Sequence, residues 1–363
     1  MTGGPIMIMA GGTGGHIFPG LAVAAELRRC DEDVVWLGTH RGLEARLVPE
    51  HGIDIEWISI RGLRGRGWRA WVLTPLQLVS AVFQVLRAFR RRRPAVVLGL
   101  GGFVSAPGGL AAWLTRLPLI IHEQNAVAGT ANRMLAPLAR SVFCAFPGAF
   151  SARVEAEVIG NPVRADIAAL PDPAVRMAGR EAQRLQLLVI GGSQGARVLN
   201  ELVPQALAAL PEARRPVVCH QAGRELAAAQ AQYAACGIAD VRIESFIDDM
   251  AGAYAQADFV IARAGALTVA ELEAAGIGAL LVPYPYAIDD HQTGNARSFA
   301  RDGAGIVVAE RDLTVQRLSA ELEALCADRD RVVRMAVTAR AQAHTQATQL
   351  LARACIDAGR AQS

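Results

Sequence analysis

The chain contains no lysine, so all 37 of its Lys and Arg residues are arginines. A Walker-type phosphate loop needs a lysine after its glycines, and Schiff-base catalysis needs a lysine amine, so both are excluded. Phosphate binding must then rely on backbone N–H groups and on arginine.

Cysteine pairs are also missing. The six cysteines are scattered without a C-x-x-C motif, and most lie in apolar surroundings such as residues 142–146. This pattern predicts buried free thiols in a reducing cytoplasm, not disulfides or a zinc site. Residues 1–5 lack the basic segment of a signal peptide, and the apolar run after them has only a strand's length.

Length and charge indicate two unlike halves. With 363 residues, of which 52% are hydrophobic, the chain can form two domains of roughly 150–200 residues each. Residues 1–160 carry 17 arginines against 11 acidic residues, whereas residues 161–363 carry 20 against 23. The basic first half predicts an anionic partner there.

Short apolar strands alternate with helical patterns along most of the chain. This alternation predicts an α/β fold with two doubly wound, Rossmann-like parallel sheets and a cleft at the carboxyl ends of their strands. The turn at residues 160–163 divides the chain into domains 1–160 and 161–340, followed by a helical tail, 341–363, whose packing stays open. The expected strands are 6–10, 34–37, 53–58, 95–98, 119–121, 187–190, 217–219, 241–243, 259–261, 280–282 and 305–308.

Three glycine-rich turns follow apolar strands at nearly equal spacing, at residues 11–15, 99–109 and 191–196. A strand that breaks into glycines before a helix exposes backbone N–H groups at the positive end of that helix. Three such turns predict a phosphorylated or diphosphate substrate.

The first turn is not a dinucleotide fingerprint, because Ile17 stands where the third glycine of G-x-G-x-x-G belongs and residues 36–39 offer no ribose-binding acid. His16 stands where this turn enters a helix. An isolated histidine there would be a core or capping residue, but among these glycines it is a candidate to touch substrate.

Two further segments place polar residues after buried strands. His122, Glu123, Gln124 and Asn125 follow the strand at 119–121 and suit sugar hydroxyls, although Asn125 could equally cap a helix. Glu271 lies in the first two turns of the helix after the turn at 263–265. It could accept both ribose hydroxyls, or only compensate the helix dipole.

Residues 61–93 combine arginines with an apolar stretch that is almost long enough to cross a bilayer. Polar residues recur every three or four positions, so spanning is not expected. A buried domain helix and an interfacial helix that meets anionic lipid are equally compatible with this pattern. The acidic clusters at 31–33, 248–249 and 289–290 lack the arrangement of metal ligands, and no metal is expected.

Taken together, six motifs resemble the bacterial lipid II-forming N-acetylglucosaminyltransferases of glycosyltransferase family 28. The resemblance runs in order through residues 6–310, so its motifs are far more specific together than singly. The segments that carry it are GGTGGHIFP at 11–19, HEQN at 122–125, GNPVR at 160–164, GGSQGA at 191–196, FIDDM at 246–250 and GALTVAE at 265–271.

The resemblance implies a GT-B fold and inverting transfer of N-acetylglucosamine from its UDP donor to the 4-hydroxyl of the muramyl sugar of lipid I, without a cofactor. The second domain would hold the donor, with Ile247 at the uracil, Glu271 at the ribose and Arg164 assisting. The diphosphate would meet Ser193 and the helix start at Ala266, Leu267 and Thr268. Val269 and Ala270, which follow in the same helix, would also belong to the substrate-binding residues. The transferred sugar would meet Asn125, Gln292, Thr13, Gly14 and Gly15.

The same resemblance places the acceptor on the first domain. His16 is the first candidate for the base and Glu123 the second. Gly101, Gly102 and Ser105 would meet the acceptor's diphosphate. The family works at the cytoplasmic face of the inner membrane, so Val72, Leu76, Val79 and Phe83 would insert peripherally into an anionic surface, flanked by Arg69 and residues 90–93.

The expected partners are therefore UDP-N-acetylglucosamine, lipid I, the membrane surface and proteins of cell-wall synthesis and division, without nucleic acid. Three alternatives remain open. They are a related lipid glycosyltransferase such as a galactosyl-diacylglycerol synthase, an epimerase acting on UDP-N-acetylglucosamine, and a non-catalytic nucleotide-sugar sensor or scaffold.

Overall fold

The computed structural model describes residues 4–60, 68–180, 182–192, 195–287 and 290–361, with only the backbone described at 68–75. The chain forms two compact units. The first contains residues 1–164 and 345–363, and the second contains residues 165–344.

The first unit is a seven-stranded parallel sheet in the order β3-β2-β1-β4-β5-β6-β7. This is the doubly wound order, in which the chain reverses direction across the sheet between β1 and β4. Its strands are β1 Ile6–Ala10, β2 Val34–Gly38, β3 Asp54–Trp57, β4 Val96–Gly101, β5 Leu119–Glu123, β6 Ser141–Cys144 and β7 Ala156–Val158. Its helices are α1 Gly14–Arg29, α2 Glu44–Glu50, α3 Trp68–Arg92, α4 Ser105–Thr115, α5 Thr130–Leu135 and α15 Ala347–Arg360.

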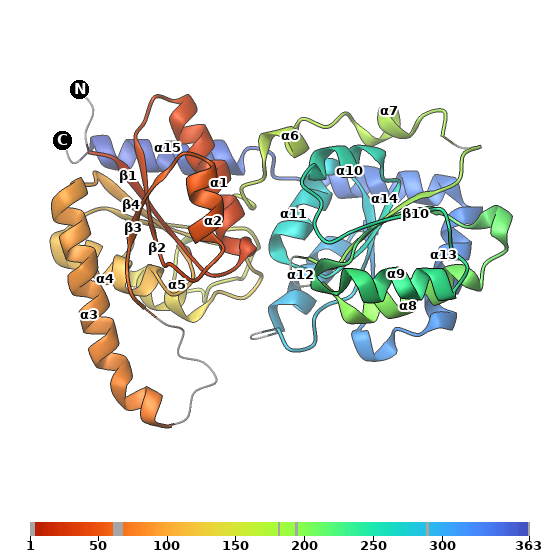
Figure 1. The fold of residues 1–363 in the computed structure, drawn as a ribbon. Coiled ribbons are helices and arrows are strands. Elements are labelled where there is room, and N and C mark those ends of the chain that lie inside the picture. The colour runs from red at the N-terminus through yellow and green to blue at the C-terminus, as the bar shows by residue number, and fades with distance from the viewer. Residues whose placement is uncertain (1–3, 61–67, 181, 193–194, 288–289, 362–363) are drawn as a thin grey trace. The chain divides into compact units, whose positions relative to one another are not determined.

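Alternate residues of β1 bury two separate apolar layers, as expected for a strand covered on both faces. Ile6 and Ile8 pack with α1 and α15, whereas Met7 and Met9 pack with α3 and α4 on the other face. Figure 1 labels these four helices around the sheet. The C-terminal helix α15, whose packing the sequence left open, contributes Leu351 to the first of these layers.

The second unit repeats the design with six parallel strands in the order β10-β9-β8-β11-β12-β13, which reverses between β8 and β11. The strands are β8 Gln186–Ile190, β9 Val217–Gln221, β10 Val241–Glu244, β11 Phe259–Ala262, β12 Gly278–Leu281 and β13 Gly305–Val307. The helices are α6 Ala165–Ala168, α7 Pro173–Met177, α8 Arg197–Ala208, α9 Leu226–Ala235, α10 Met250–Gln256, α11 Ala266–Ala275, α12 His291–Ala300, α13 Val315–Ala327 and α14 Arg329–Ala341.

Each strand expected from an apolar run is present, with ends that differ by at most three residues. Strands β6 and β7 were not expected from the sequence. The latter is an edge strand with exposed residues, so it lacks a continuous apolar run. The expectation of buried thiols holds for Cys144 and Cys355, but Cys30 is exposed.

Helix α3 has two apolar faces. Val82, Val85 and Phe89 are buried against the sheet. Leu76, Val79 and Phe83 are exposed, at 69%, 53% and 62% of their surface. Among the helices in the described part of the chain, none is both long enough and apolar enough to cross a bilayer.

Candidate functional site

The first two glycine turns lie side by side, because they follow the neighbouring strands β1 and β4 at the point where the strand order reverses. Gly12 and Gly102 have φ angles of +97° and +81°, which favour glycine. A Cβ on Gly102 would lie 2.2 Å from the carbonyl oxygen of Gly11, so the two turns are in backbone contact. This reversal point is where doubly wound folds bind ligands.

The first turn leads directly into α1, as predicted. Thr13 precedes the helix with an exposed side chain, and Gly14 and Gly15 form its first turn. This turn is held by hydrogen bonds to a carboxylate, that of Glu44, which was not predicted from the sequence. Glu44 is fully buried and accepts hydrogen bonds from the Gly12 N–H at 3.0 Å and from the Thr39 hydroxyl at 2.8 Å. Its only sequence signal was an acid at the start of a short helix.

His16 is half-buried in the first turn of α1, and its Nδ1 lies 2.9 Å from Oε1 of Gln124, at the end of β5. Gln124 in turn contacts His122, whose Nε2 lies 2.8 Å from the Gly160 carbonyl oxygen. His122 is fully buried, and that burial lowers its pKa to about 4. His122, within β5, and Gln124, directly after it, therefore form a hydrogen-bonded support for His16.

Glu123 is buried as well, and both of its carboxylate oxygens are occupied. Oε1 accepts from the Asn125 backbone N–H at 3.0 Å and from its side-chain amide at 3.2 Å. Oε2 accepts from the Gly129 N–H at 3.0 Å and from the Asn132 amide at 2.8 Å. Glu123 thus shapes the loop that presents the half-exposed Asn125.

Ser105 is likewise occupied within its own loop. It is fully buried, its Oγ accepts from the Gly101 N–H at 3.0 Å, and it donates to the Gly101 carbonyl at 2.7 Å. These bonds hold Gly101 at a φ of +101°. Ser105 lies next to the expected diphosphate position but uses its hydroxyl to build the turn.

In the second unit, the predicted donor residues all follow the carboxyl ends of parallel strands, and so lie at one edge of the sheet. Ile247 follows β10, the helix start at 266–271 follows β11, and Gln292 follows β12. The third glycine turn follows β8, where Gly195 has a φ of +82° and a Cβ would lie 2.5 Å from the Ala222 carbonyl. Ser193, within this turn, lies outside the described residues.

Helix α11 begins at Ala266, with Gly265 preceding it in an extended conformation. Leu267 and Thr268 are half-buried, while Val269 and Ala270 are buried. Glu271 is only 8% exposed, and its Oε2 accepts a hydrogen bond from the Tyr254 hydroxyl at 3.1 Å. A buried carboxylate held by a tyrosine at the start of a helix is oriented more firmly than a surface acid that only offsets the helix dipole.

The other predicted donor residues have different surroundings. Ile247 is 2% exposed. Gln292 accepts a hydrogen bond from the Tyr284 backbone N–H at 2.9 Å through its side-chain oxygen. Arg164 is half-buried and is the last residue of the first unit before the chain enters the second.

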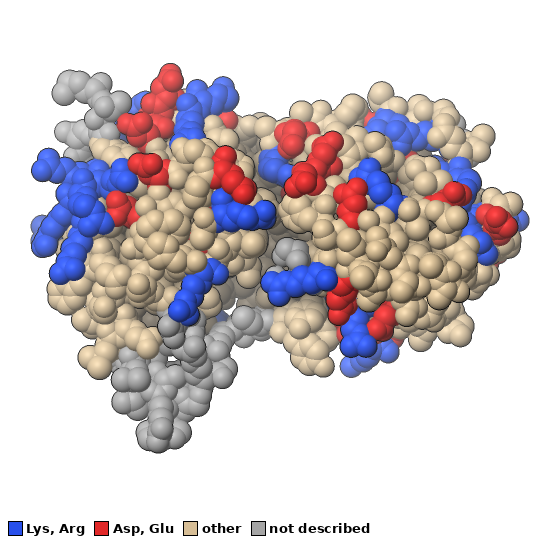
Figure 2. Space-filling model, viewed as in Figure 1, with Lys and Arg blue, Asp and Glu red and all other residues tan. Residues whose placement is uncertain are grey.

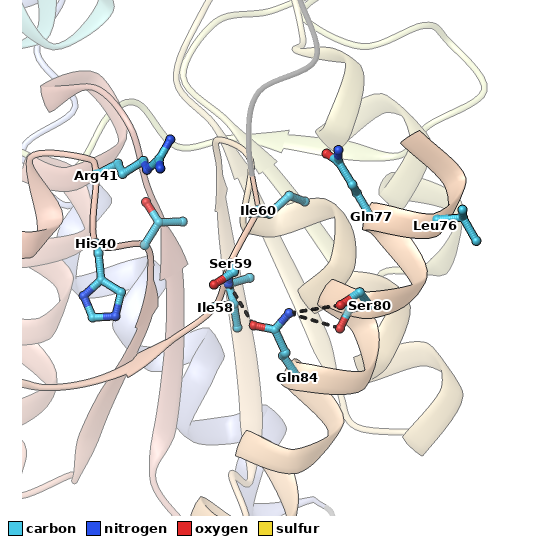
Figure 3. A pocket seen from close by; sticks show the side chains of 10 residues that line it. His40, Arg41, Ile58, Ser59, Ile60, Leu76, Gln77, Ser80 and Gln84 are labelled. Carbon is cyan, nitrogen blue, oxygen red and sulfur yellow. Dashed lines mark hydrogen bonds between the residues drawn. The ribbon is translucent and has the colours of Figure 1, made fainter. Parts of the chain in front are cut away.

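A pocket of about 630 Å³ lies in the first unit beyond β2 and β3, beside α3 (Figure 3). Gln84 closes one side by accepting a hydrogen bond from the Ser59 N–H at 2.8 Å and by donating to the Ser80 carbonyl at 3.3 Å. His40 and Arg41 line the opposite side, and Leu76 lies at its edge. Polar and apolar side chains thus both line the pocket, which borders the exposed apolar face of α3.

Among the described residues, no three His, Cys, Asp or Glu side chains gather so that they could hold a metal ion. Each unit thus has glycine-lined helix starts of its own at the carboxyl edge of its sheet. Because the chain has no lysine, arginine is the only permanent side-chain cation that either unit can offer.

Comparison with known proteins covers almost the whole chain. Residues 6–144 match the glycosyltransferase family 28 N-terminal domain, and residues 186–351 match the family's C-terminal domain. Two relatives are both described as UDP-N-acetylglucosamine–N-acetylmuramyl-(pentapeptide) pyrophosphoryl-undecaprenol N-acetylglucosamine transferase. The protein from Nitrosococcus oceani is 57% identical over 97% of this chain and 98% of its own length. The protein from Alkalilimnicola ehrlichii is 54% identical over 98% and 99%.

Among solved structures, MurG of Acinetobacter baumannii is similar with a TM-score of 0.82 and 39% identity, covering 98% of this chain and 99% of that one. Together with the two parallel sheets, this similarity confirms the expected GT-B fold.

Proposed function

The chain belongs to glycosyltransferase family 28, and from this premise we propose that it transfers N-acetylglucosamine from UDP-N-acetylglucosamine to lipid I, forming lipid II for peptidoglycan synthesis. The observation that carries this proposal is the 57% identity over 97% of the chain to a relative described as that transferase.

We assign the donor to the second unit. Diphosphate binding fits the glycine turn after β8 and the start of α11, because backbone N–H groups stabilise the charge that develops as UDP leaves. Glu271 accepts the ribose hydroxyls, Ile247 offers its backbone to the uracil, and Arg164 adds positive charge at the diphosphate. Gln292 and Asn125 hold the sugar that is transferred.

We assign the acceptor to the first unit, where Gly101 and Gly102 shape the turn for its diphosphate. His16 accepts the proton of the muramyl 4-hydroxyl while that oxygen bonds to C1 of the sugar and the bond from C1 to UDP breaks. One displacement inverts the anomeric centre. His16 is favoured over Glu123 because Glu123 is 2% exposed and both of its oxygens already accept hydrogen bonds.

We propose further that the enzyme binds peripherally to the cytoplasmic face of the membrane through α3 and α4. Leu76, Val79 and Phe83 expose a row of apolar surface that the fold does not bury, and Trp113 and Leu114 of α4 are each 53% exposed. Figure 2 shows basic side chains gathered over the C-terminal end of α3, where Arg90, Arg91 and Arg92 form its last turn. Exposed apolar side chains beside arginines suit an anionic lipid surface.

The pocket beside α3 borders this face, so part of a membrane-held acceptor can reach it past Leu76.

The decisive experiment measures UDP release from UDP-N-acetylglucosamine with and without a soluble lipid I analogue. Release that requires the analogue supports the proposal. Release that requires diacylglycerol would indicate a different lipid glycosyltransferase. Tight binding of the UDP-sugar without acceptor-dependent release would indicate a sensor and would contradict a catalytic role.

A further inference from the structure

We infer that Gln124 is a positioning residue that holds His16 in the tautomer protonated at Nδ1, which leaves the lone pair on Nε2 for the acceptor hydroxyl. This inference rests on the proposed role of His16 as the base. It adds the residue that determines which ring nitrogen can act.

The argument begins at the Gly160 carbonyl, which can only accept. His122 Nε2 lies 2.8 Å from this oxygen and must therefore carry a proton. Because burial lowers the pKa of His122 to about 4, the ring is neutral near pH 7, and its Nδ1 carries a lone pair. His122 is thus an acceptor at Nδ1.

This acceptor determines the orientation of the Gln124 amide. The amide nitrogen lies 3.1 Å from His122 Nδ1 and 2.9 Å from the His122 carbonyl oxygen, and both of these atoms accept. A flipped amide would instead place its oxygen against two acceptors, which is unfavourable. The Gln124 side-chain oxygen must therefore face His16.

The orientation of Gln124 then determines the state of His16. Its Nδ1 lies 2.9 Å from the Gln124 side-chain oxygen, which can only accept, so Nδ1 carries the proton. In the neutral ring Nε2 is then unprotonated, and it makes no hydrogen bond with any residue that the structure describes. A base needs such a nitrogen within reach of the substrate's hydroxyl.

Gln124 is itself held firmly. It is 1% exposed, and its backbone carbonyl accepts a hydrogen bond from the Asn161 amide at 3.0 Å. The amide therefore has little freedom to rotate away from His16, and the chain of bonds from Gly160 to His16 forms one connected network.

The first test measures the tautomer in the full-length protein labelled with ¹⁵N-histidine. Long-range ¹H–¹⁵N correlation spectra at about pH 8, above the ordinary histidine pKa, distinguish protonated from unprotonated ring nitrogens. The signal of His16, among seven histidines, is assigned by its loss in His16→Gln. We expect a protonated Nδ1 and a bare Nε2, and a proton on Nε2 would overturn the inference.

The second test replaces the amide by an apolar side chain of similar size, Gln124→Met. The Nε2–H tautomer of His16 should then become the major form, and kcat should fall about tenfold to a hundredfold. The KM for UDP-N-acetylglucosamine should change little, because we assign the uracil, ribose and diphosphate of that substrate to the second unit. Gln205→Met, at an exposed glutamine of α8, serves as the control that leaves tautomer and kcat unchanged.

A Gln124→Met protein that folds and keeps the wild-type tautomer contradicts the inference. If this variant does not fold, the wild-type spectrum alone decides. Failure of the underlying role of His16 is distinguishable, because His16→Ala would then keep most of kcat whatever tautomer the spectrum shows.

Discussion

Gly101 lies directly against the imidazole of His16: a Cβ at position 101 would come within 3.0 Å of His16 Cε1 and 3.1 Å of its Nδ1. The second glycine turn thus packs against the proposed base. Glycine at 101 is required both by its φ of +101° and by the space that the ring occupies.

Replacement of Gly101 by alanine should therefore lower kcat, because the methyl group displaces His16 from Gln124. The matched control is Gly148→Ala, at a φ of +77° with nothing within 4 Å of the added Cβ. Both variants carry a backbone strain of about 1–2 kcal/mol, and both should melt a few degrees lower. Only Gly101→Ala should lose turnover, and equal kcat values in the two variants would contradict the placement of His16.

A comparison of His16→Ala with Glu123→Gln tests which residue is the base. Loss of the base should reduce kcat by about a hundredfold or more with little change in UDP-sugar affinity. Glu123→Gln places an amide against groups that donate to the carboxylate, so it should lower the unfolding free energy by about 1–3 kcal/mol. Calorimetry and steady-state kinetics on both variants separate these effects. A stable Glu123→Gln protein without turnover would reverse the assignment.

Most strands and helix starts of both units could be predicted from the local sequence pattern. Continuous apolar runs predicted the strands, and the glycines after them predicted helix starts, because both signals depend on neighbouring residues alone. The pairing of the turns was not readable, since equal spacing along the chain says nothing about which strands are neighbours. The strand order places the turn after β1 beside the one after β4.

The contacts that support these turns could not be predicted for the same reason. Gln124 and His16 are 108 positions apart, and Glu44 reaches Gly12 across 32. The residues next to these positions in the sequence do not indicate either contact. Glu123, the second candidate for the base, is surrounded in the folded chain by four donors, which its position in the sequence did not indicate.

Glu271→Gln should weaken UDP binding about tenfold, the effect of losing a charge-assisted hydrogen bond of roughly 1.5 kcal/mol to the ribose. Titration calorimetry with UDP and with 2′,3′-dideoxy-UDP makes the test specific, because the variant and the wild type should bind the dideoxy ligand equally. Glu273→Gln, two positions along α11 and so on its opposite side, is the control. Equal losses for both ligands would place Glu271 away from the ribose.

The combined substitution of Leu76 and Phe83 by serine should reduce binding to vesicles that contain anionic phospholipid. Each buried apolar side chain contributes about 1.5–3 kcal/mol, so the pair should change the partition constant by at least about a hundredfold. Val337→Ser, at an exposed apolar residue of α14, controls for general surface effects. Sedimentation at low and high salt measures the partition, and arginine contacts predict weaker binding in salt. If the wild-type protein does not bind these vesicles at low salt, the proposal of a membrane-binding face is contradicted.

Glu273 should make the second unit less stable as the pH rises. Burial raises the pKa of Glu273 to about 8, from an ordinary value of 4.5. Below the ordinary value the carboxyl is protonated in both states and folding is unaffected. Between these two values the unfolded chain releases the proton while the folded one keeps it, so stability falls as the pH rises and the full loss is reached above pH 8.

The side chain of Glu273→Gln is neutral at every pH. The melting temperature of this variant should therefore equal that of the wild type near pH 4.5 and exceed it by a growing margin as the pH rises towards 8. Glu212→Gln, at an exposed glutamate of the same unit, should show no such growing difference. Differential scanning calorimetry across this range measures both. A constant offset between Glu273→Gln and wild type would mean that the carboxyl is ionised in the folded protein.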